Sequence, residues 1–409
     1  MRLTRQAALV SALAVLTLAC AGYSAFTSPL GGDYPGPACK GCDYAGPAID
    51  ALADGRIGDF FATQPPMGSL TLVLRAPVVA AAQALGAGEL LKYQLGSLAC
   101  LLFAAALIWL LVRLMRPSGR REWLLVAAFI VIVLAGPLTA KALFWGHPEE
   151  PVGALLCVAA VVLAGRGRGL AAGLALGLAL ATKQWAILAI IPALHVAQGQ
   201  RKRLLIAAAA TALVFMLPML AGDPGRFIGQ NLGAGTGGQH GAYVGVTPTN
   251  VWFAYGLNDG ESLSGGGNTY VIDSSIAALS HPLVLLFGIG LPLLLWRLKR
   301  QASAQDALLV LALVFLLRCL LDPLSASYHH VPFFVTIAAY EALRRRGLPI
   351  ISACSALTLW VLARWIAPSG DAVTMNRVYL AWALPVALYM VVKTFRSGAR
   401  LGFPVAQPG

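Results

Sequence analysis

The chain has 409 residues, of which 58% are hydrophobic and only 11% are charged, and its mean hydropathy is +0.74. This composition excludes a soluble globular protein, because aqueous folding cannot bury so much apolar surface. The net charge of +13 does not indicate nucleic-acid binding, since the cations lie in short clusters between apolar runs, where they mark cytoplasmic loops. We therefore predict an all-α polytopic membrane protein.

The first predicted element is an apolar helix near residues 6–27, preceded by Arg2 and Arg5. A cleaved signal peptide is the alternative interpretation, because Ala19-Cys20-Ala21 resembles a cleavage site. The apolar run continues to Phe26, which is long enough to span a bilayer, and we therefore expect an uncleaved membrane helix.

Residues 28–88 form the predicted first extracytoplasmic loop. Five of the eleven aspartates crowd here: Asp33, Asp43, Asp50, Asp54 and Asp59. Pro47 and Gly55 bracket a short helix on which Asp50 and Asp54 share a solvated face. Cys39 and Cys42 form a single CxxC, for which a local disulfide is expected rather than zinc. The other five cysteines lie in apolar runs and are expected in the core.

The run 65–86 is long enough to cross a membrane, but Arg75 and Pro77 lie in its middle. Counting it as a span would place every later basic cluster outside. We therefore predict an interfacial or re-entrant helix at this position.

Twelve membrane helices are expected, several shorter than the usual ~20 residues: 6–27, 89–115, 123–143, 150–165, 169–182, 184–200, 204–222, 282–297, 306–321, 331–343, 347–366 and 378–395. In this topology 20 of the 30 Lys and Arg residues are cytoplasmic, as are both termini. The chain is expected to form one membrane domain, 1–409, in a bacterial inner membrane, with a long Gly-rich extracytoplasmic loop at 223–281.

Ionisable residues gather at the extracytoplasmic helix ends, and such residues in a membrane protein are site candidates. The alternative is a wetted rim of loop residues. The gathered residues are Lys141, His147, Glu149, Glu150, Lys183, Asp322, His329 and His330. The letters GAGTGG at 233–238 do not predict a dinucleotide site, because no strand precedes them. Gly169, Gly173 and Gly177, spaced by four, predict close helix packing.

Several short motifs occur in an order that resembles the membrane-embedded GT-C glycosyltransferases, and among them glycosyltransferase family 87. They are Asp43 with Tyr44, Ala51, Leu52 and Gly55; QPPM at 64–67; GHPEE at 146–150; ATKQW at 181–185; and SASYHHVP at 325–332. The sequence departs from the family pattern at Gln64, at Met67 and in a contracted Ser-Ala-Ser-Tyr-His-His.

The resemblance implies an inverting transferase that moves a sugar, mannose or arabinofuranose, from a polyprenyl-phosphate donor to a lipid or glycan acceptor. Asp43 is the expected base, with Asp33 as the competing candidate. The expected ligands of the donor phosphate are Lys183, His147, Arg75, His329 and His330. No cofactor is expected, and metal binding by the aspartate and histidines fits no known ligand spacing.

Two other functions compete with this one. A transporter or flippase would use the polar vestibule, but such proteins commonly show repeated halves and midplane sites, and no internal repeat is visible here. A degenerate GT-C fold could instead serve as an assembly partner. The sequence does not specify the sugar, the acceptor or the oligomeric state.

Overall fold

The computed structural model describes residues 2–29, 45–62, 68–225, 227–228, 243–258, 270–299, 301–344 and 349–396. Seven of the helices in these ranges are long and apolar enough to cross a bilayer: Gln6–Thr27, Glu89–Met115, Arg120–Phe144, Arg201–Gly222, Ser274–Leu298, Ala304–Leu321 and Ala372–Phe395. Five shorter helical segments fill the other predicted spans: Glu149–Gly165, Gly169–Leu180, Gln184–Val196, Val331–Arg344 and Ile350–Ile366. The protein is thus an all-α polytopic membrane protein, as predicted.

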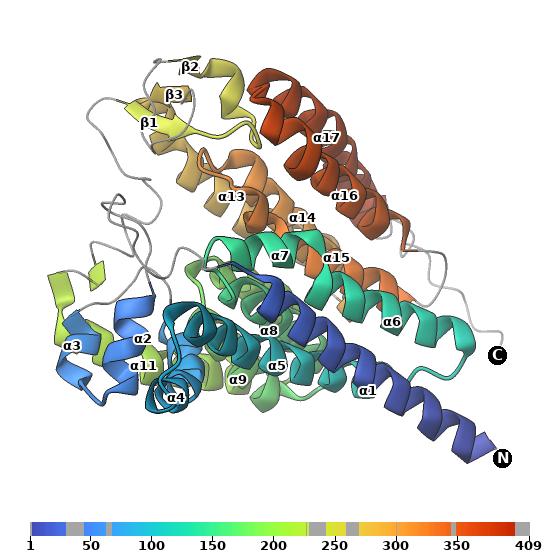
Figure 1. The fold of residues 1–409 in the computed structure, drawn as a ribbon. Helices are drawn as coiled ribbons and strands as arrows, with labels where there is room; N and C mark the ends of the chain where they lie inside the picture. The colour runs from blue at the N-terminus through green and yellow to red at the C-terminus, as the bar shows by residue number, and fades with distance from the viewer. Residues whose placement is uncertain are drawn as a thin grey trace, which may run out of the picture.

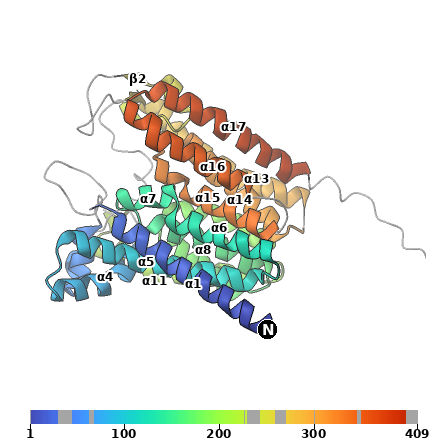
Figure 2. The ribbon, with the colours of Figure 1, turned by 45° about the vertical axis from the view of Figure 1, so that its right-hand side comes forward.

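The two ends of the bundle differ in what they carry (Figure 1). The start of α1 (Arg2–Thr27) and the last turn of α17 (Ala372–Arg396) lie at one end, here called the terminal end. A small β-sheet and the short helices α2 (Gly46–Ala53) and α3 (Ile57–Ala62) lie at the opposite end, here called the sheet end. The same separation is visible after rotation (Figure 2). Between these two ends, successive membrane helices run alternately toward and away from the sheet end.

The centre of the bundle is α8 (Glu149–Gly165), in which every side chain from Glu149 to Ala164 is buried. It packs against α5 (Glu89–Met115), α9 (Gly169–Leu180) and α15 (Val331–Arg344). A helix that is apolar all round and lies at the middle of a bundle needs no polar face. Its burial explains why two carboxylates at its first turn are also removed from solvent.

Close packing of α9 against α11 (Arg201–Gly222) follows the predicted glycine stripe. A Cβ on Gly173 would lie 2.4 Å from the Leu204 carbonyl oxygen, and one on Gly177 would lie 2.5 Å from Thr211 Cβ. Only glycine permits this approach of the two backbones. The packing function predicted for the stripe is confirmed.

The first predicted extracytoplasmic loop contains α2, α3 and α4 (Ser69–Ala84), the helix predicted over 65–86. Pro47 lies in the first turn of α2, and Gly55 has a φ of +73° just beyond its end. Asp54 is exposed and pairs with Arg56, as a solvated face requires. Asp50 differs, because it is half-buried and accepts hydrogen bonds from Gln83 and Lys92.

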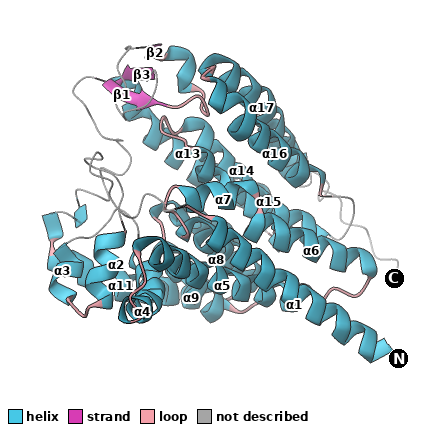
Figure 3. Cartoon of the chain, viewed as in Figure 1, coloured by secondary structure: helices cyan, strands magenta, loops and turns pink. Residues whose placement is uncertain are grey.

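The Gly-rich loop predicted over 223–281 contains a three-stranded antiparallel sheet of order β1-β3-β2. Its strands are β1 (Tyr243–Val246), β2 (Leu257–Asn258) and β3 (Tyr270–Asp273), which Figure 3 shows in magenta. The predicted loop end at 281 is wrong, because α13 (Ser274–Leu298) begins at Ser274, where the Asp273 carboxylate caps its first turn. The strand β3 ends at Asp273, and the cap by this residue lets the helix begin several residues before the apolar run that was expected to start it.

Local breaks divide three predicted spans. The span 123–143 becomes α6 (Arg120–Ala135) and α7 (Pro137–Phe144), with the break at Gly136 and Pro137. The span 184–200 is a 3₁₀ turn, η1 (Gln184–Ala189), followed by α10 (Ile190–Val196), and α16 (Ile350–Val361) ends in a π-helical turn. Cys354 in α16 is exposed, so its predicted core position is wrong, while Cys20, Cys100, Cys157 and Cys319 are buried.

Candidate functional site

A buried polar cluster lies where α7 ends, α8 begins and α9 turns into η1. Lys183 Nζ lies 3.0 Å from Glu149 Oε1 and 3.8 Å from Glu150 Oε1. His147 Nδ1 lies 2.8 Å from the same Glu149 oxygen. Glu149 is 0% and Glu150 1% exposed, and desolvated carboxylates of this kind are tolerated only beside cations or hydrogen-bond donors.

Local backbone geometry brings these side chains together. Gly146 adopts a φ of +81°, which reverses the chain after α7, and Pro148 leads into the first turn of α8. Both glutamates thus sit at the N-terminus of α8, where backbone N–H groups favour negative charge. Lys183 is the extended residue between α9 and η1, so the short turn there aims its amine at the glutamates.

The chain after the QPPM motif joins this cluster through backbone hydrogen bonds. Gly68 N donates to Thr182 O at 3.0 Å, and Leu70 N donates to Ala181 O at 3.1 Å. A Cβ on Gly68 would lie 1.9 Å from Ala181 O, so only glycine allows this approach. The start of α4 is therefore held against the turn that carries Lys183. Residues 64–67 themselves lie outside the described residues.

The SASYHH motif contributes Tyr328 and His329 from η3 (Ser327–His330). The Tyr328 ring stacks on His147 with the ring centres 4.5 Å apart, and the His329 ring contacts Tyr328 edge-on. His329 Nδ1 accepts a hydrogen bond from Ala326 N. Burial lowers the pKa of His329 well below its usual range, and the nearby Arg318 and Lys183 lower it further. At neutral pH His329 is therefore an uncharged ring.

His330 points away from the cluster. Its Nδ1 lies 3.1 Å from Ser327 O, its Nε2 lies 2.9 Å from the Tyr379 hydroxyl of α17, and the side chain is completely buried. Burial lowers the pKa of His330 to about 4. The prediction that His330 binds the donor phosphate gains no support from this position, in which it joins η3 to α17.

We expect His330 to make the protein acid-sensitive. Its pKa is depressed from an ordinary value near 6.5, so the stability it contributes is full above about pH 6.5 and is lost as the pH falls toward 4, at a cost on the order of 3 kcal/mol. Thermal unfolding in one detergent at pH 7.5 and pH 5 should show a smaller acid loss for His330→Gln than for wild type. The partly exposed His281 provides the control His281→Gln. Parallel acid losses in all three proteins would contradict this role.

Arg75 of α4 is a buried residue. It is 1% exposed between α4 and α5, with its guanidinium 5.8 Å from the centre of the Tyr93 ring. A Cβ on Gly96 of α5 would lie 3.1 Å from Arg75 Nε. Tyr93 in turn donates a hydrogen bond to the Leu143 carbonyl of α7. Arg75 therefore packs inside the protein, and its role as a ligand of the donor phosphate stays a prediction.

Sequence reasoning missed Arg318 of α14 (Ala304–Leu321). Its guanidinium lies 5.9 Å from the centre of the Trp185 ring and interacts electrostatically with Glu150. Within the described part of the chain, the buried Nη1 atom of Arg318 has no hydrogen-bond partner. The signal was present, since an arginine inside an apolar span is a site candidate. Lys183 thus pairs with Glu149, and Arg318 is a second cation near Glu150.

The predicted base, its competitor and the predicted disulfide stay predictions. Asp43, Asp33, Cys39 and Cys42 lie outside the described residues. Among the residues that the structure describes, no three His, Cys, Asp or Glu side chains form a group that could hold a metal ion.

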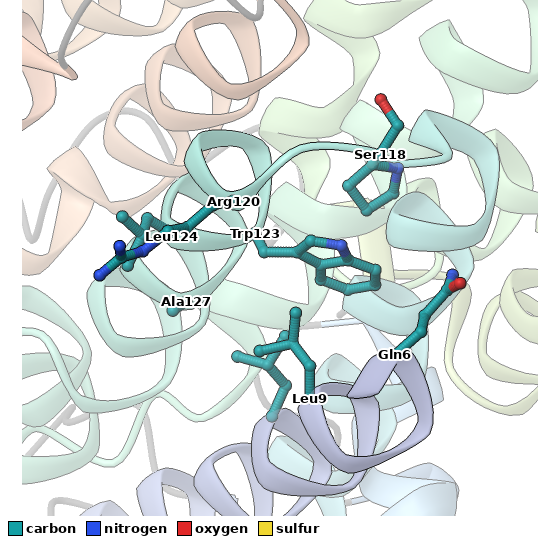
Figure 4. Close-up of a pocket in the computed structure, with 9 residues that line it drawn as sticks. Gln6, Leu9, Ser118, Arg120, Trp123, Leu124 and Ala127 are labelled. Atoms are coloured by element: carbon teal, nitrogen blue, oxygen red, sulfur yellow. The ribbon is translucent and has the colours of Figure 1, made fainter. Parts of the chain in front are cut away.

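A separate cavity of about 620 Å³ lies at the terminal end, between α1 and α6. Leu9 projects into it from α1 and Trp123 from α6 (Figure 4). Among the described residues that line it, Arg120 alone is ionisable. It offers neither the carboxylates nor the paired cations that make the cluster at the sheet end a candidate for chemistry.

The fold and the site define a multi-pass helical membrane protein with charged groups buried at one end of its bundle. The chain belongs to glycosyltransferase family 87, whose family model matches residues 63–326. This match confirms the family resemblance seen in the motifs, and the protein is a membrane glycosyltransferase. The matched range includes His147, Lys183 and Arg318, whereas Asp43 precedes it and His329 follows it.

The comparison with solved structures found the crystal structure of ArnT from Cupriavidus metallidurans bound to undecaprenyl phosphate. The two chains are 15% identical with a TM-score of 0.48, and the similarity covers 97% of this chain and 79% of ArnT. The search of curated proteins found no match.

Proposed function

We propose that this family 87 protein transfers a sugar, mannose or arabinofuranose, from a polyprenyl-phosphate donor to a lipid or glycan acceptor. The reaction takes place at the sheet end, which the basic clusters predict to be extracytoplasmic. The observation that carries the proposal is the ion pair between Lys183 and the buried Glu149 carboxylate, which His147 also contacts.

The proposed reaction is a single inverting displacement. The acceptor hydroxyl attacks the anomeric carbon, the Asp43 carboxylate takes the hydroxyl proton, and the bond between the anomeric carbon and the phosphate oxygen breaks. The leaving group is polyprenyl phosphate, on which negative charge develops. Because the leaving group is a monophosphate rather than a diphosphate, fixed side-chain cations are sufficient to stabilise it.

Lys183 is the cation best placed for that stabilisation. Its amine already lies in a desolvated site, where a charge interacts more strongly with a phosphate than it would in water. Glu149 fixes the amine and also holds His147 Nδ1, so His147 Nε2 can face the ligand. Arg318 brings a buried guanidinium nitrogen that has no hydrogen-bond partner among the described residues. The donor phosphate would therefore bind cationic groups that Glu149 and Glu150 already hold in place, and it would compete with these two carboxylates for them.

A transporter would need polar groups near the midplane of the bundle. The buried cluster instead lies at the ends of α7, α8 and α9, which supports surface chemistry over transport.

The test is transfer by the purified protein, with polyprenyl-phosphate-mannose or polyprenyl-phosphate-arabinofuranose as labelled donor and a membrane glycolipid extract as acceptor. We expect labelled acceptor with an inverted anomeric centre and one polyprenyl phosphate released per sugar. Nucleotide sugars serve as the control donors and should give no product. In proteoliposomes, intact donor that crosses the bilayer without sugar transfer would contradict the proposal and favour a flippase.

A further inference from the structure

A cavity of about 800 Å³ opens at the sheet end, on the side of η3 that faces the β-sheet and α17. Its walls come from α7, the sheet, the segment before η3 and the α16–α17 turn. The polar and aromatic residues of its lining include Lys141, Trp145, Thr247, Tyr270, Ser327 and Asp371. This volume is in the range of small-ligand sites.

Buried asparagines hold the cavity wall in place. Asn250 is 0% exposed, and its Nδ2 donates to Thr247 O and to Pro323 O, both at 2.7 Å. Its Oδ1 accepts hydrogen bonds from the backbone N–H groups of Trp252 and Phe253. All hydrogen-bonding groups of this amide are therefore directed into the protein, which fixes the 247–253 segment.

A second asparagine joins the wall to α17. Asn376 Nδ2 donates to Pro248 O at 2.9 Å and to Asn250 O at 2.8 Å. The two amides join three segments that lie far apart in the sequence. The segment PTNVWF at 248–253 is therefore a fixed part of the cavity wall. A wall that is already rigid loses little conformational entropy when a ligand binds, which favours binding.

The chemistry of the lining suits a carbohydrate. Trp145 and Tyr270 offer aromatic surfaces, and the C–H groups on one face of a sugar ring pack favourably on such a π face. Ser327 brings a hydroxyl, and Thr247 brings one that already donates to Ser325 O at 2.9 Å and is left to accept. Asp371 brings a carboxylate that accepts a hydrogen bond from Thr374 N.

Lys141 is the cation of this cavity. Its Nζ lies 4.5 Å from the centre of the Phe144 ring and 5.8 Å from that of Trp145. It forms no ion pair with any residue that the structure describes. An ammonium group carries three N–H donors, and the hydroxyl oxygens of a sugar are suitable acceptors for them.

The cavity and the polar cluster share two elements. α7 carries Lys141 and leads through Trp145 to His147, and the segment of Ser327 continues into Tyr328, which stacks on His147. A molecule in the cavity therefore lies next to the proposed donor phosphate site. We propose that this cavity binds the carbohydrate of the acceptor, with a sugar ring stacked on Trp145; this assignment rests on the proposed function.

The test compares Trp145→Ala with Trp365→Ala. Both tryptophans are exposed, by 50% and 66%, but Trp365 does not line the cavity. Initial rates are measured with polyprenyl-phosphate-mannose as donor and a titrated membrane glycolipid extract as acceptor. We expect Trp145→Ala to raise the apparent acceptor KM about tenfold, as the loss of one aromatic contact predicts, with donor KM unchanged. Lys141→Gln should also raise the apparent acceptor KM, and Trp365→Ala should keep the wild-type acceptor KM.

Each other outcome has a distinct meaning. An unchanged acceptor KM in both Trp145→Ala and Lys141→Gln, with wild-type transfer, overturns the acceptor assignment and leaves the proposed function standing. A raised donor KM at unchanged acceptor KM assigns the cavity to the donor and also overturns the inference. A wild-type protein that transfers sugar from no polyprenyl-phosphate donor overturns the proposed function, and the inference with it.

Discussion

Replacing Lys183 by methionine is expected to lower sugar transfer by about 10²–10³-fold, the usual loss when one fixed group that stabilises developing charge is removed. Methionine keeps much of the length of the side chain and removes its charge. The same change leaves Glu149 buried without its 3.0 Å ion pair, which should also lower the free energy of unfolding by about 3–5 kcal/mol. Transfer rates and thermal unfolding of the purified variant check the two effects.

Two further variants separate catalysis from stability. Lys183→Met combined with Glu149→Gln removes both charges, so we expect unfolding close to wild type while transfer stays low. Lys299→Met breaks a 2.6 Å pair with Asp306 at the terminal end, and it should lower stability without changing transfer by the folded protein. If the double variant recovers both stability and transfer, Lys183 is a structural residue only.

Replacing Asp43 by asparagine is expected to reduce transfer by about 10²–10⁴-fold, because a general base contributes a rate factor of this size. Asparagine is nearly isosteric with aspartate but cannot accept the proton of the acceptor hydroxyl. The donor KM should change little, since the proposed phosphate ligands remain. Steady-state kinetics with the polyprenyl-phosphate donor measure the two parameters separately.

Other aspartates of the same loop supply the controls. Asp54→Asn alters an exposed carboxylate that pairs with Arg56, and it should transfer sugar at the wild-type rate. Asp33→Asn tests the competing base. A loss of transfer in Asp33→Asn with normal rates in Asp43→Asn would reassign the base.

The membrane helices could be predicted because lipid acts as solvent for long apolar runs. Each of the twelve predicted runs contains helix in its described part, and seven of these helices are long and apolar enough to cross a bilayer. The apolar run 65–86 predicted the helix at Ser69–Ala84, but its packing against α5 could not be predicted. Its interfacial position, for which Arg75 and the positive-inside rule were the arguments, stays a prediction. The early end of the Gly-rich loop escaped prediction, because strands of two to four residues show no clear alternation of polar and apolar residues.

The site was predictable in its composition more than in its geometry. The order of motifs brought His147 and Lys183 into one hypothesis, and the structure joins both through Glu149. The paired histidines were treated alike, yet successive residues of a 3₁₀ turn point about 120° apart, so His329 contacts Tyr328 while His330 contacts Tyr379. Arg318 was missed because its partner Glu150 lies more than a hundred residues away in sequence, and only tertiary packing brings them together.

The most direct test of the account is the position of the phosphate in a structure of the protein with polyprenyl-phosphate-mannose bound. We predict a phosphate oxygen about 3 Å from Lys183 Nζ, at the sheet end and beside His147. A phosphate bound elsewhere, with Lys183 still held by Glu149 and making no contact with the donor, would contradict the proposed site.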